Sequence, residues 1–164
     1  MYERVSKTNY YLDIAAVVSE RSTCLRRRYG AVVVNDDRIV STGYNGAPCG
    51  RPNCCDLGYC YREANHIPHG ERYEACCSVH AEANAIISAS REEMKGATLY
   101  LACTDPETEE IVSGTNCCDM CQRTILNSGI SKVIIRDTKQ DFRVISIDDW
   151  KESYGSLFRG NKND

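Results

Sequence analysis

The stretch Glu74–Ile86, EACCSVHAEANAI, places two cysteines, a histidine and a glutamate just before and inside a predicted helix. Apolar residues recur at helical spacing through residues 79–93, which predicts a helix over that range. Its apolar side is expected to consist of Ala83, Ile86, Ile87 and Ala89. His80 and Glu82 stand at its beginning. Because residues i and i+2 do not share a helix face, these two side chains can reach one site only from the helix end.

A second predicted helix also begins with side chains that bind metals. Residues 118–129, CDMCQRTILNSG, are expected to form a helix that ends at Gly129. Cys118 and Cys121 open it with Cys-x-x-Cys spacing, which lets both sulfurs reach one tetrahedral ion. The positive end of a helix and its free N–H groups favour thiolates there. With His80 as a third, neutral ligand, the pattern predicts a zinc ion whose fourth position is left for water, which is the catalytic arrangement.

Glu82 is not a ligand in this arrangement. A carboxylate at the same helix end lies beside the zinc, where it can take a proton from the bound water and hand it to a substrate. Taken alone, Cys-x-x-Cys is also typical of a structural zinc half-site or a redox pair. Here each of two helices opens with one half of the pattern and a strand lies between them, which favours the catalytic interpretation.

The elements around these helix starts predict one α/β domain over residues 1–164. Strands that alternate with helices late in the chain indicate parallel strands with helical crossovers. The expected fold is a central mixed sheet with helices on both faces, a three-layer α/β/α arrangement, with a core of about 8–137 and an extension over 138–164. The expected elements are a helix over 8–20, a hairpin over 29–35 and 38–45, strands over 97–103, 132–137 and 144–147, and a final helix from about Asp148.

The composition is that of an ordinary globular domain, with 164 residues, 42% hydrophobic and 26% charged. A net charge of −3 argues against a nucleic-acid binder, which usually has a basic surface. No apolar run is long enough for a signal peptide or a membrane span, so we expect a cytoplasmic protein without a membrane partner.

Eleven cysteines are many for this length, and three adjacent pairs occur among them. Adjacent cysteines rarely bond to each other, and a disulfide framework is not expected without a secretory signal. The surplus of cysteines therefore indicates metal binding or catalysis. Cys103 ends an apolar run and is expected to be a buried hydrophobic side chain instead.

Six motifs along the chain are jointly specific. They are RSTCLRRRYGAVVV (21–34), STGYNGAP (41–48), NCCD (53–56), VHAEANAI (79–86), CCDMC (117–121) and NSGISKVII (127–135). Over about residues 8–137 the sequence resembles the deoxycytidylate (dCMP) deaminases of the cytidine deaminase superfamily. The combination of STGYNG with NCCD is typical of this branch rather than of the tRNA adenosine or riboflavin-pathway deaminases.

The resemblance implies the same zinc ligands and a five-stranded sheet between helices, with Glu82 as the proton shuttle. It implies hydrolysis of dCMP to dUMP and ammonia, which supplies dUMP for dTMP synthesis. Asn45 of the GYNG motif would contact the sugar, and Ala81 would also contact the substrate. The family further implies a homo-oligomer, a hexamer, with dCTP and dTTP as effectors that bind near the GYNG loop.

The chain departs from the family pattern in two places. Cys117 stands where the family usually has proline, and Cys118 is preferred as the ligand because it keeps the two-residue spacing to Cys121. A polar segment, 105–115, is inserted where the family's strand runs almost directly into the zinc cysteines. We expect it beside the mouth of the active site, where it covers the pocket, alters which nucleotide fits, or forms a surface hairpin.

Residues 46–77 show no lasting hydrophobic period, and an irregular segment of this length needs a functional or metallic reason. In some relatives the positions of Cys24 and Cys54 supply ligands to a second, structural zinc. We expect Cys60 and Cys76 to complete that site here. Three further side chains are alternative ligands: His69, Cys55 and Cys77. The other interpretation is a packed or disordered loop with free thiols.

Two other functions remain open. The nearest is the same chemistry on dCTP, CMP, deoxycytidine or a modified pyrimidine. The other is a cysteine-rich zinc module that binds protein or nucleic acid and has no use for Glu82; the net charge of −3 argues against it. A nucleotide phosphate needs cationic or N–H donors. The candidate cations are arginines: Arg26, Arg27, Arg28, Arg51, Arg62 and Arg72.

Overall fold

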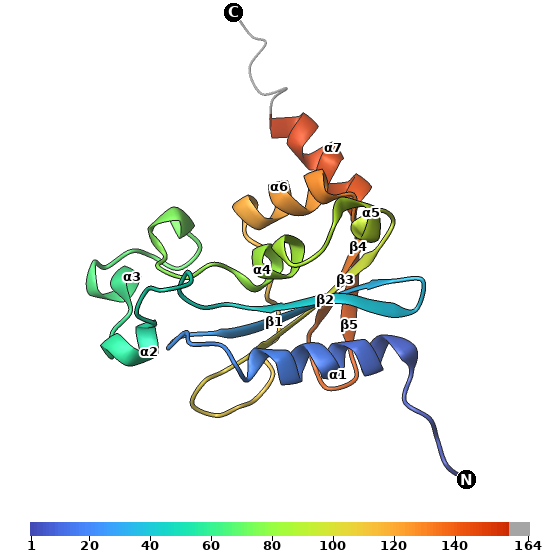
Figure 1. Cartoon of the computed structure of the whole chain (residues 1–164), viewed down its shortest axis with the longest axis horizontal. Coiled ribbons are helices and arrows are strands. Elements are labelled where there is room, and N and C mark those ends of the chain that lie inside the picture. The colour runs from blue at the N-terminus through green and yellow to red at the C-terminus, as the bar shows by residue number, and fades with distance from the viewer. Residues whose placement is uncertain (158–164) are drawn as a thin grey trace, which may run out of the picture.

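A five-stranded mixed sheet lies at the centre of the computed structural model, which describes residues 1–157 (Figure 1). The strand order is β2-β1-β3-β4-β5. β1 pairs antiparallel with β2 and β3, β3 pairs parallel with β4, and β4 pairs antiparallel with β5. The predicted hairpin and mixed sheet are confirmed. The strand bounds are Arg28–Asn35 (β1), Arg38–Tyr44 (β2), Thr98–Thr104 (β3), Lys132–Arg136 (β4) and Phe142–Ser146 (β5).

Helices cover both faces of this sheet, which confirms the three-layer prediction (Figure 1). One face is covered by α1 (Lys7–Ser19), and its N-cap Ser6 accepts a hydrogen bond from the Asn9 amide. The helices of the other face are α4 (Ala81–Ile87), α5 (Arg91–Met94), α6 (Asp119–Ser128) and α7 (Ile147–Leu157).

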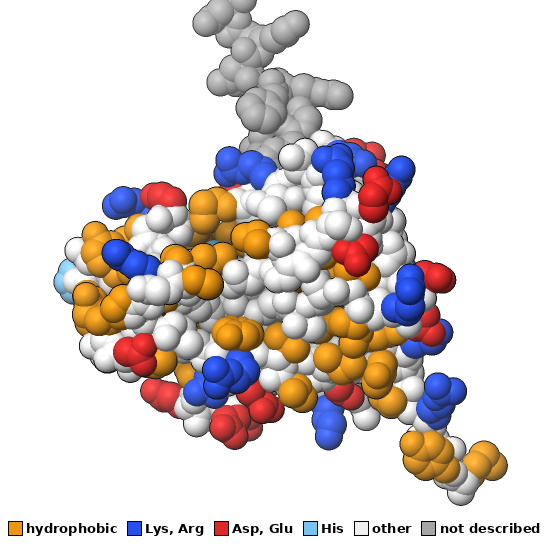
Figure 2. All heavy atoms as spheres, viewed as in Figure 1, with side chains coloured by type: hydrophobic (Ala, Val, Ile, Leu, Met, Phe, Trp, Pro, Cys, Tyr) orange, Lys and Arg blue, Asp and Glu red, His pale blue; other side chains and the backbone are white. Residues whose placement is uncertain are grey.

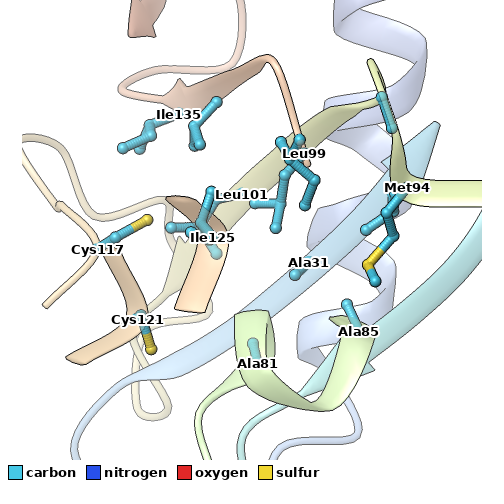
Figure 3. Packing of buried hydrophobic residues seen from close by; sticks show 14 of the residues in the cluster. Ala31, Ala81, Ala85, Met94, Leu99, Leu101, Cys117, Cys121, Ile125 and Ile135 are labelled. Atoms are coloured by element: carbon cyan, nitrogen blue, oxygen red, sulfur yellow. The ribbon is translucent and has the colours of Figure 1, made fainter. Parts of the chain in front are cut away.

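The alternation of side chains along β1 builds a core on each face of the sheet. Val32 and Val34 belong to the cluster packed with α1. Ala31 and Val33 belong to the cluster that α4 and α6 share, and Figure 3 shows Ala31 between Leu99 of β3 and the alanines of α4. Cys117 and Cys121 lie at one end of that cluster (Figure 3). The two helices expected to carry the zinc ligands are therefore packed against the same core.

The prediction of one helix over 79–93 is wrong at its centre. α4 ends at Ile87, and α5 begins just after Ser90. The Ser90 hydroxyl accepts a hydrogen bond from the Glu93 amide, and the Glu93 carboxylate accepts one from the Ser90 amide. This capping box starts a new helix. The expected apolar side ends with α4, and Ile87 is 76% exposed.

Residues 46–77 are an ordered segment that contains short helices. Arg62 is 6% exposed, and its Nη2 donates hydrogen bonds to the carbonyl oxygens of Pro68 (2.9 Å) and Glu71 (2.5 Å). Its guanidinium carbon lies 4.5 Å from the centre of the Tyr73 ring. Arg62 therefore holds this segment together. The short helices are α2 (Cys54–Leu57), α3 (Tyr61–Ala64) and a 3-10 turn (Tyr73–Ala75).

The extension predicted over 138–164 supplies β5 and α7. Ile147 is 4% exposed and belongs to the core that α4 and α6 share, and Ile145 and Trp150 pack against it. The end of that extension, 158–164, lies outside the described residues. Over residues 1–157 no helix has both the length and the apolar character needed to cross a membrane.

Gly43 sets how closely β2 approaches α4. A Cβ atom here would lie 2.3 Å from the Ala81 carbonyl oxygen and 2.3 Å from the Ala85 amide nitrogen. We expect Gly43→Ala to lower the free energy of unfolding by about 1–3 kcal/mol, the usual range for overpacking. It should also weaken zinc binding, because α4 carries His80. Denaturant unfolding and zinc titration measure the two effects. Thr42→Ala at the exposed neighbouring position is the control, and equal stability of both variants would contradict the prediction.

Candidate active site

The side chains at the N-termini of α4 and α6 lie together at one site. His80 and Cys118 are the N-cap residues of α4 and α6, with extended backbones at φ −73°, ψ 156° and φ −68°, ψ 163°. An N-cap side chain stands at the end of its helix rather than on a face. Cys121 follows in the first turn of α6. Hydrogen bonds between the backbones of Gly46 and Val79 (3.1 and 2.8 Å) fix the chain just before His80.

The three predicted zinc ligands lie together. His80 Nδ1 is 3.4 Å from the Sγ atom of Cys118 and 3.4 Å from that of Cys121. The three ligand atoms lie within 4.8 Å of one another, and no other such group of three exists in the described chain. Atoms about 2.0–2.3 Å from a tetrahedral zinc ion are about 3.5 Å from each other. The nitrogen and two sulfurs therefore fit zinc in both chemistry and spacing.

Without a bound metal, hydrogen bonds connect the three ligand side chains. Hydrogen bonds from Cys121 and His80 lower the pKa of the Cys118 thiol, which favours the thiolate that binds metals. The Cys118 sulfur in turn raises the pKa of His80 to about 10. Because zinc binds thiolate and neutral imidazole, zinc binding releases protons and must weaken as the pH falls.

Glu82 lies in the first turn of α4, beside the ligand group but outside it. It is 4% exposed, and burial raises the pKa of its carboxyl. The thiol of Cys117, which is 3% exposed, donates a hydrogen bond to it. Cys117 therefore contacts Glu82 and lies outside the ligand group, whereas Cys118 lies within that group, as the two-residue spacing predicted. A buried carboxyl with a raised pKa suits proton transfer near neutral pH.

His80, Glu82 and Cys118 line a hollow of about 430 Å³. Its wall also contains Tyr29, Asn45, Tyr73 and the start of the inserted segment, Asp105–Glu107. The expectation that 105–115 lies beside the active site is confirmed. That segment is folded back on the sheet by a bridge between Thr104 and Ile111.

Asn45 is 6% exposed, and its side chain is bonded to the chain itself. Its Oδ1 accepts hydrogen bonds from the Ser22 hydroxyl (2.5 Å) and the Tyr29 amide (2.8 Å). Its Nδ2 donates to the Arg27 carbonyl (2.9 Å). Asn45 thus holds the loop between α1 and β1, and its contact with a sugar stays a prediction. Ala81 is fully buried in the core, and its contact with a substrate stays a prediction too.

The cysteines expected at a second zinc are neighbours without forming a compact ligand group. In residues 1–157 no three of their sulfurs lie within 4.8 Å of one another. Burial, followed by the charges of Cys24 and Cys60, raises the pKa of Cys54 to about 11. Burial acts to raise the pKa of Cys76, but hydrogen bonds with His80 and the backbone outweigh it and lower that pKa. The four predicted ligands are Cys24, Cys54, Cys60 and Cys76.

Two contacts of His80 were not predicted from the sequence. The Tyr73 ring stands edge-on to the imidazole, with ring centres 5.7 Å apart, and Cys76 hydrogen-bonds to the same ring. Together with the two cysteine sulfurs at Nδ1, these contacts restrain the orientation of the His80 ring. The only signal in the sequence was the short distance along the chain from Tyr73 and Cys76 to His80.

Several of the predicted phosphate-binding arginines have carboxylate partners. Arg28 is partly buried and Arg51 is exposed. Pairing reduces the charge that an arginine can offer to a ligand. The ion pairs are Arg26 with Glu63 (2.9 Å), Arg27 with Asp105 (3.1 Å) and Arg72 with Glu74 (3.1 Å).

Comparison with known proteins places the matched region over both helix starts. The model of the cytidine and deoxycytidylate deaminase zinc-binding region matches residues 5–136. The deoxycytidylate deaminase of Mycobacterium phage D29 is 39% identical over 129 residues, which cover 76% of this chain and 90% of the relative. That of Enterobacteria phage T4 is 32% identical, with 80% of this chain and 78% of the relative covered.

Solved structures of deaminases share the fold of this chain. The dCMP deaminase of cyanophage S-TIM5 in complex with dCMP and dUMP has a TM-score of 0.55 at 26% identity, over 84% of this chain and 85% of that chain. A cytidine deaminase of Burkholderia pseudomallei, 16% identical, shares the fold with a TM-score of 0.51 over 84% of this chain and 91% of that chain. On this sequence similarity and this arrangement of ligands, the chain belongs to the deoxycytidylate deaminase family of the cytidine and deoxycytidylate deaminase zinc-binding superfamily.

Proposed function

We propose that this protein catalyses the zinc-dependent hydrolysis of dCMP to dUMP and ammonia, and so supplies dUMP for dTMP synthesis. One observation carries the proposal: the buried carboxyl of Glu82 lies beside a three-ligand nitrogen and sulfur group, in the wall of a hollow. Similarity to deoxycytidylate deaminases over most of the chain supports dCMP as the substrate.

Each polar group of the site has a task in this reaction. His80, Cys118 and Cys121 would hold the zinc, which when bound supplies a water of lowered pKa at neutral pH. Glu82 takes up one proton of the attacking water as its oxygen bonds to C4 of cytosine, and delivers that proton to ring nitrogen N3. It then moves the second proton of the same water to the amino group, which leaves as ammonia when the C4–N bond breaks. Because Glu82 is 4% exposed, its proton passes to the substrate rather than to bulk water.

A parallel substrate assay tests this proposal. Loss of cytosine ultraviolet absorbance is followed for zinc-loaded protein with dCMP, dCTP, CMP and deoxycytidine. We expect the highest kcat/KM with dCMP. A higher value with another of the four would replace dCMP by that compound. No turnover of any would refute deamination of cytosine compounds and favour a zinc module that only binds partners.

We also propose that a second, structural zinc lies among the cysteines near Cys54. The support is that four cysteines lie close enough to the buried Cys54 sulfur to add to the effect of burial in raising its pKa: Cys24, Cys60, Cys76 and Cys77. Binding requires the sulfurs to draw together, since no three lie within 4.8 Å of one another in the described chain. Metal analysis should find about two zinc ions per chain, and about one after Cys24→Ser. One zinc per chain in the unaltered protein would refute the second site.

We further propose that the protein is a cytoplasmic homo-oligomer, a hexamer, that responds to dCTP and dTTP. Hydrophobic side chains reach the surface over α1 and over the segment of α2 and α3 (Figure 2). Val17 of α1 is 61% exposed, and Ile87 of α4 is 76% exposed. Such patches suit contacts between copies of the chain. Light scattering after gel filtration measures the mass, and a monomer at all concentrations would contradict the proposal.

A further inference from the structure

A second hollow, of about 550 Å³, adjoins the first one. Tyr29, Tyr73, Asn116 and Cys118 lie in the walls of both. A ligand whose base lies beside Glu82 in the first hollow can therefore extend past these shared side chains into the second. The question is which part of a nucleotide the second hollow suits.

The two hollows differ in charge. Three arginines line each of them. The first hollow also has four carboxylates in its wall, Glu63, Glu82, Asp105 and Glu107, whereas the second has two, Glu74 and Asp119. An anionic group is therefore more stable in the second hollow than in the outer part of the first.

Arg123 supplies the distinctive cation of the second hollow. It belongs to α6, and its Nε donates a hydrogen bond to the Asp119 carbonyl oxygen (3.2 Å). Over residues 1–157 it forms no ion pair with a carboxylate, in contrast to Arg27 and Arg72, which share the same hollow. Its two terminal nitrogens thus remain available as a planar pair of donors, the geometry that suits a phosphate.

Asn116 presents an N–H donor at the boundary of the two hollows. Nη1 of Arg143 donates a hydrogen bond to Asn116 Oδ1 (2.9 Å). Because the oxygen end of the amide is occupied, the amino end is the one left to contact a ligand. Asn116 is exposed, so a ligand in the hollow can reach its amino group.

Arg143 is itself held firmly. Its Nε and Nη2 donate to the two carboxylate oxygens of Asp137 (2.7 and 3.1 Å), and Nη2 also donates to the Thr115 carbonyl (2.5 Å). Asp137 accepts a further hydrogen bond from the Gly114 amide (2.9 Å). The ends of β4 and β5 therefore anchor the last residues of the inserted segment, next to the zinc cysteines.

We propose that the second hollow binds the 5′-phosphate of the nucleotide, with Arg123 as its cation and the amino group of Asn116 as an N–H donor oriented by Arg143. This inference rests on the proposed function for the choice of a nucleotide. It gives Arg143 the role of a positioning residue.

Calorimetric binding of dUMP and deoxyuridine to the zinc-loaded full chain tests the subsite without turnover. We expect dUMP to bind on the order of 100-fold more tightly than deoxyuridine, and Arg123→Gln to reduce that ratio about 10- to 100-fold, the usual loss of charged hydrogen bonds. Arg91→Gln, an exposed arginine outside both hollows, is the matched control and should keep the ratio.

Three further variants test the N–H donor Asn116 and the residue that orients it. Asn116→Asp places a carboxylate where the amino group stood and should reduce the ratio more than Asn116→Ala does. Arg143→Gln should reduce it as well, with the zinc content unchanged. Equal binding of dUMP and deoxyuridine by the unaltered protein, or an unchanged ratio in Arg123→Gln, would overturn the proposal. Preferential binding of dUMP without deamination of dCMP would leave the subsite standing and refute the proposed function.

Discussion

Glu82→Gln should keep the zinc and lose about 10³-fold or more in kcat for dCMP. General acid–base catalysis commonly contributes about 10²- to 10⁴-fold, and Glu82 handles more than one proton in the proposed reaction. The amide has the shape of the carboxyl, so the packing around this buried residue is retained. Steady-state rates and metal analysis of the same preparation measure both quantities.

The stability of this variant separates a catalytic role from a structural one. Burial raises the pKa of Glu82 above its unfolded value, so ionisation of this carboxyl costs the metal-free folded state stability as the pH rises above the unfolded pKa. Glutamine removes that cost. Metal-free Glu82→Gln should therefore be at least as stable as the unaltered chain near pH 7. Lower stability together with lost zinc would show that Glu82 supports the fold, and retained turnover would refute the proton shuttle.

Cys118→Ser should abolish activity by removing a zinc ligand while α6 keeps its start. Cys118 is the N-cap of α6, and its side chain makes no capping hydrogen bond. Serine is among the preferred N-cap residues, so the helix should not be weakened. We expect the dissociation constant for zinc to rise on the order of 100-fold or more, since even partners of the ligands contribute that much. Competition with a chelator measures it.

The matched control for this variant is Cys49→Ser, because Cys49 is an exposed cysteine outside the ligand group. It should keep zinc and activity. Equal zinc affinity of Cys118→Ser and Cys49→Ser would contradict the assignment of Cys118 as a zinc ligand. Complete loss of zinc binding in Cys117→Ser alone would assign Cys117 as the ligand instead. The buried position of Cys117 against Glu82 argues for the first assignment.

The zinc ligands and Glu82 were predictable because their positions depend on local rules. Helix starts can be inferred from spacing and composition, and the side chains of the N-cap and first turn lie around the N-terminus of the helix whatever the rest of the chain does. The parallel pairing of β3 and β4 followed from α6 between them. These features depend on a few residues each, so the sequence alone indicated them.

Features that depend on distant contacts were not predictable in this way. The break after Ile87 follows from a capping box at Ser90, which competes with an apolar period that continues through it. Asn45 carries a motif position, yet its amide is bonded to Ser22 and the backbones of two other segments. Arg143 contacts Asn116 only because β5 lies beside β4, and nothing local in either stretch indicates that pairing.

The most direct test of the central claim is incubation of the zinc-loaded chain with dCMP in water enriched in oxygen-18. Mass spectrometry of the nucleotide and an ammonia assay are run on the same sample. Hydrolytic deamination predicts dUMP that carries one oxygen-18 atom from water, with an equal amount of ammonia, and no product with Glu82→Gln. Unchanged dCMP, or dUMP without the label, would contradict the account.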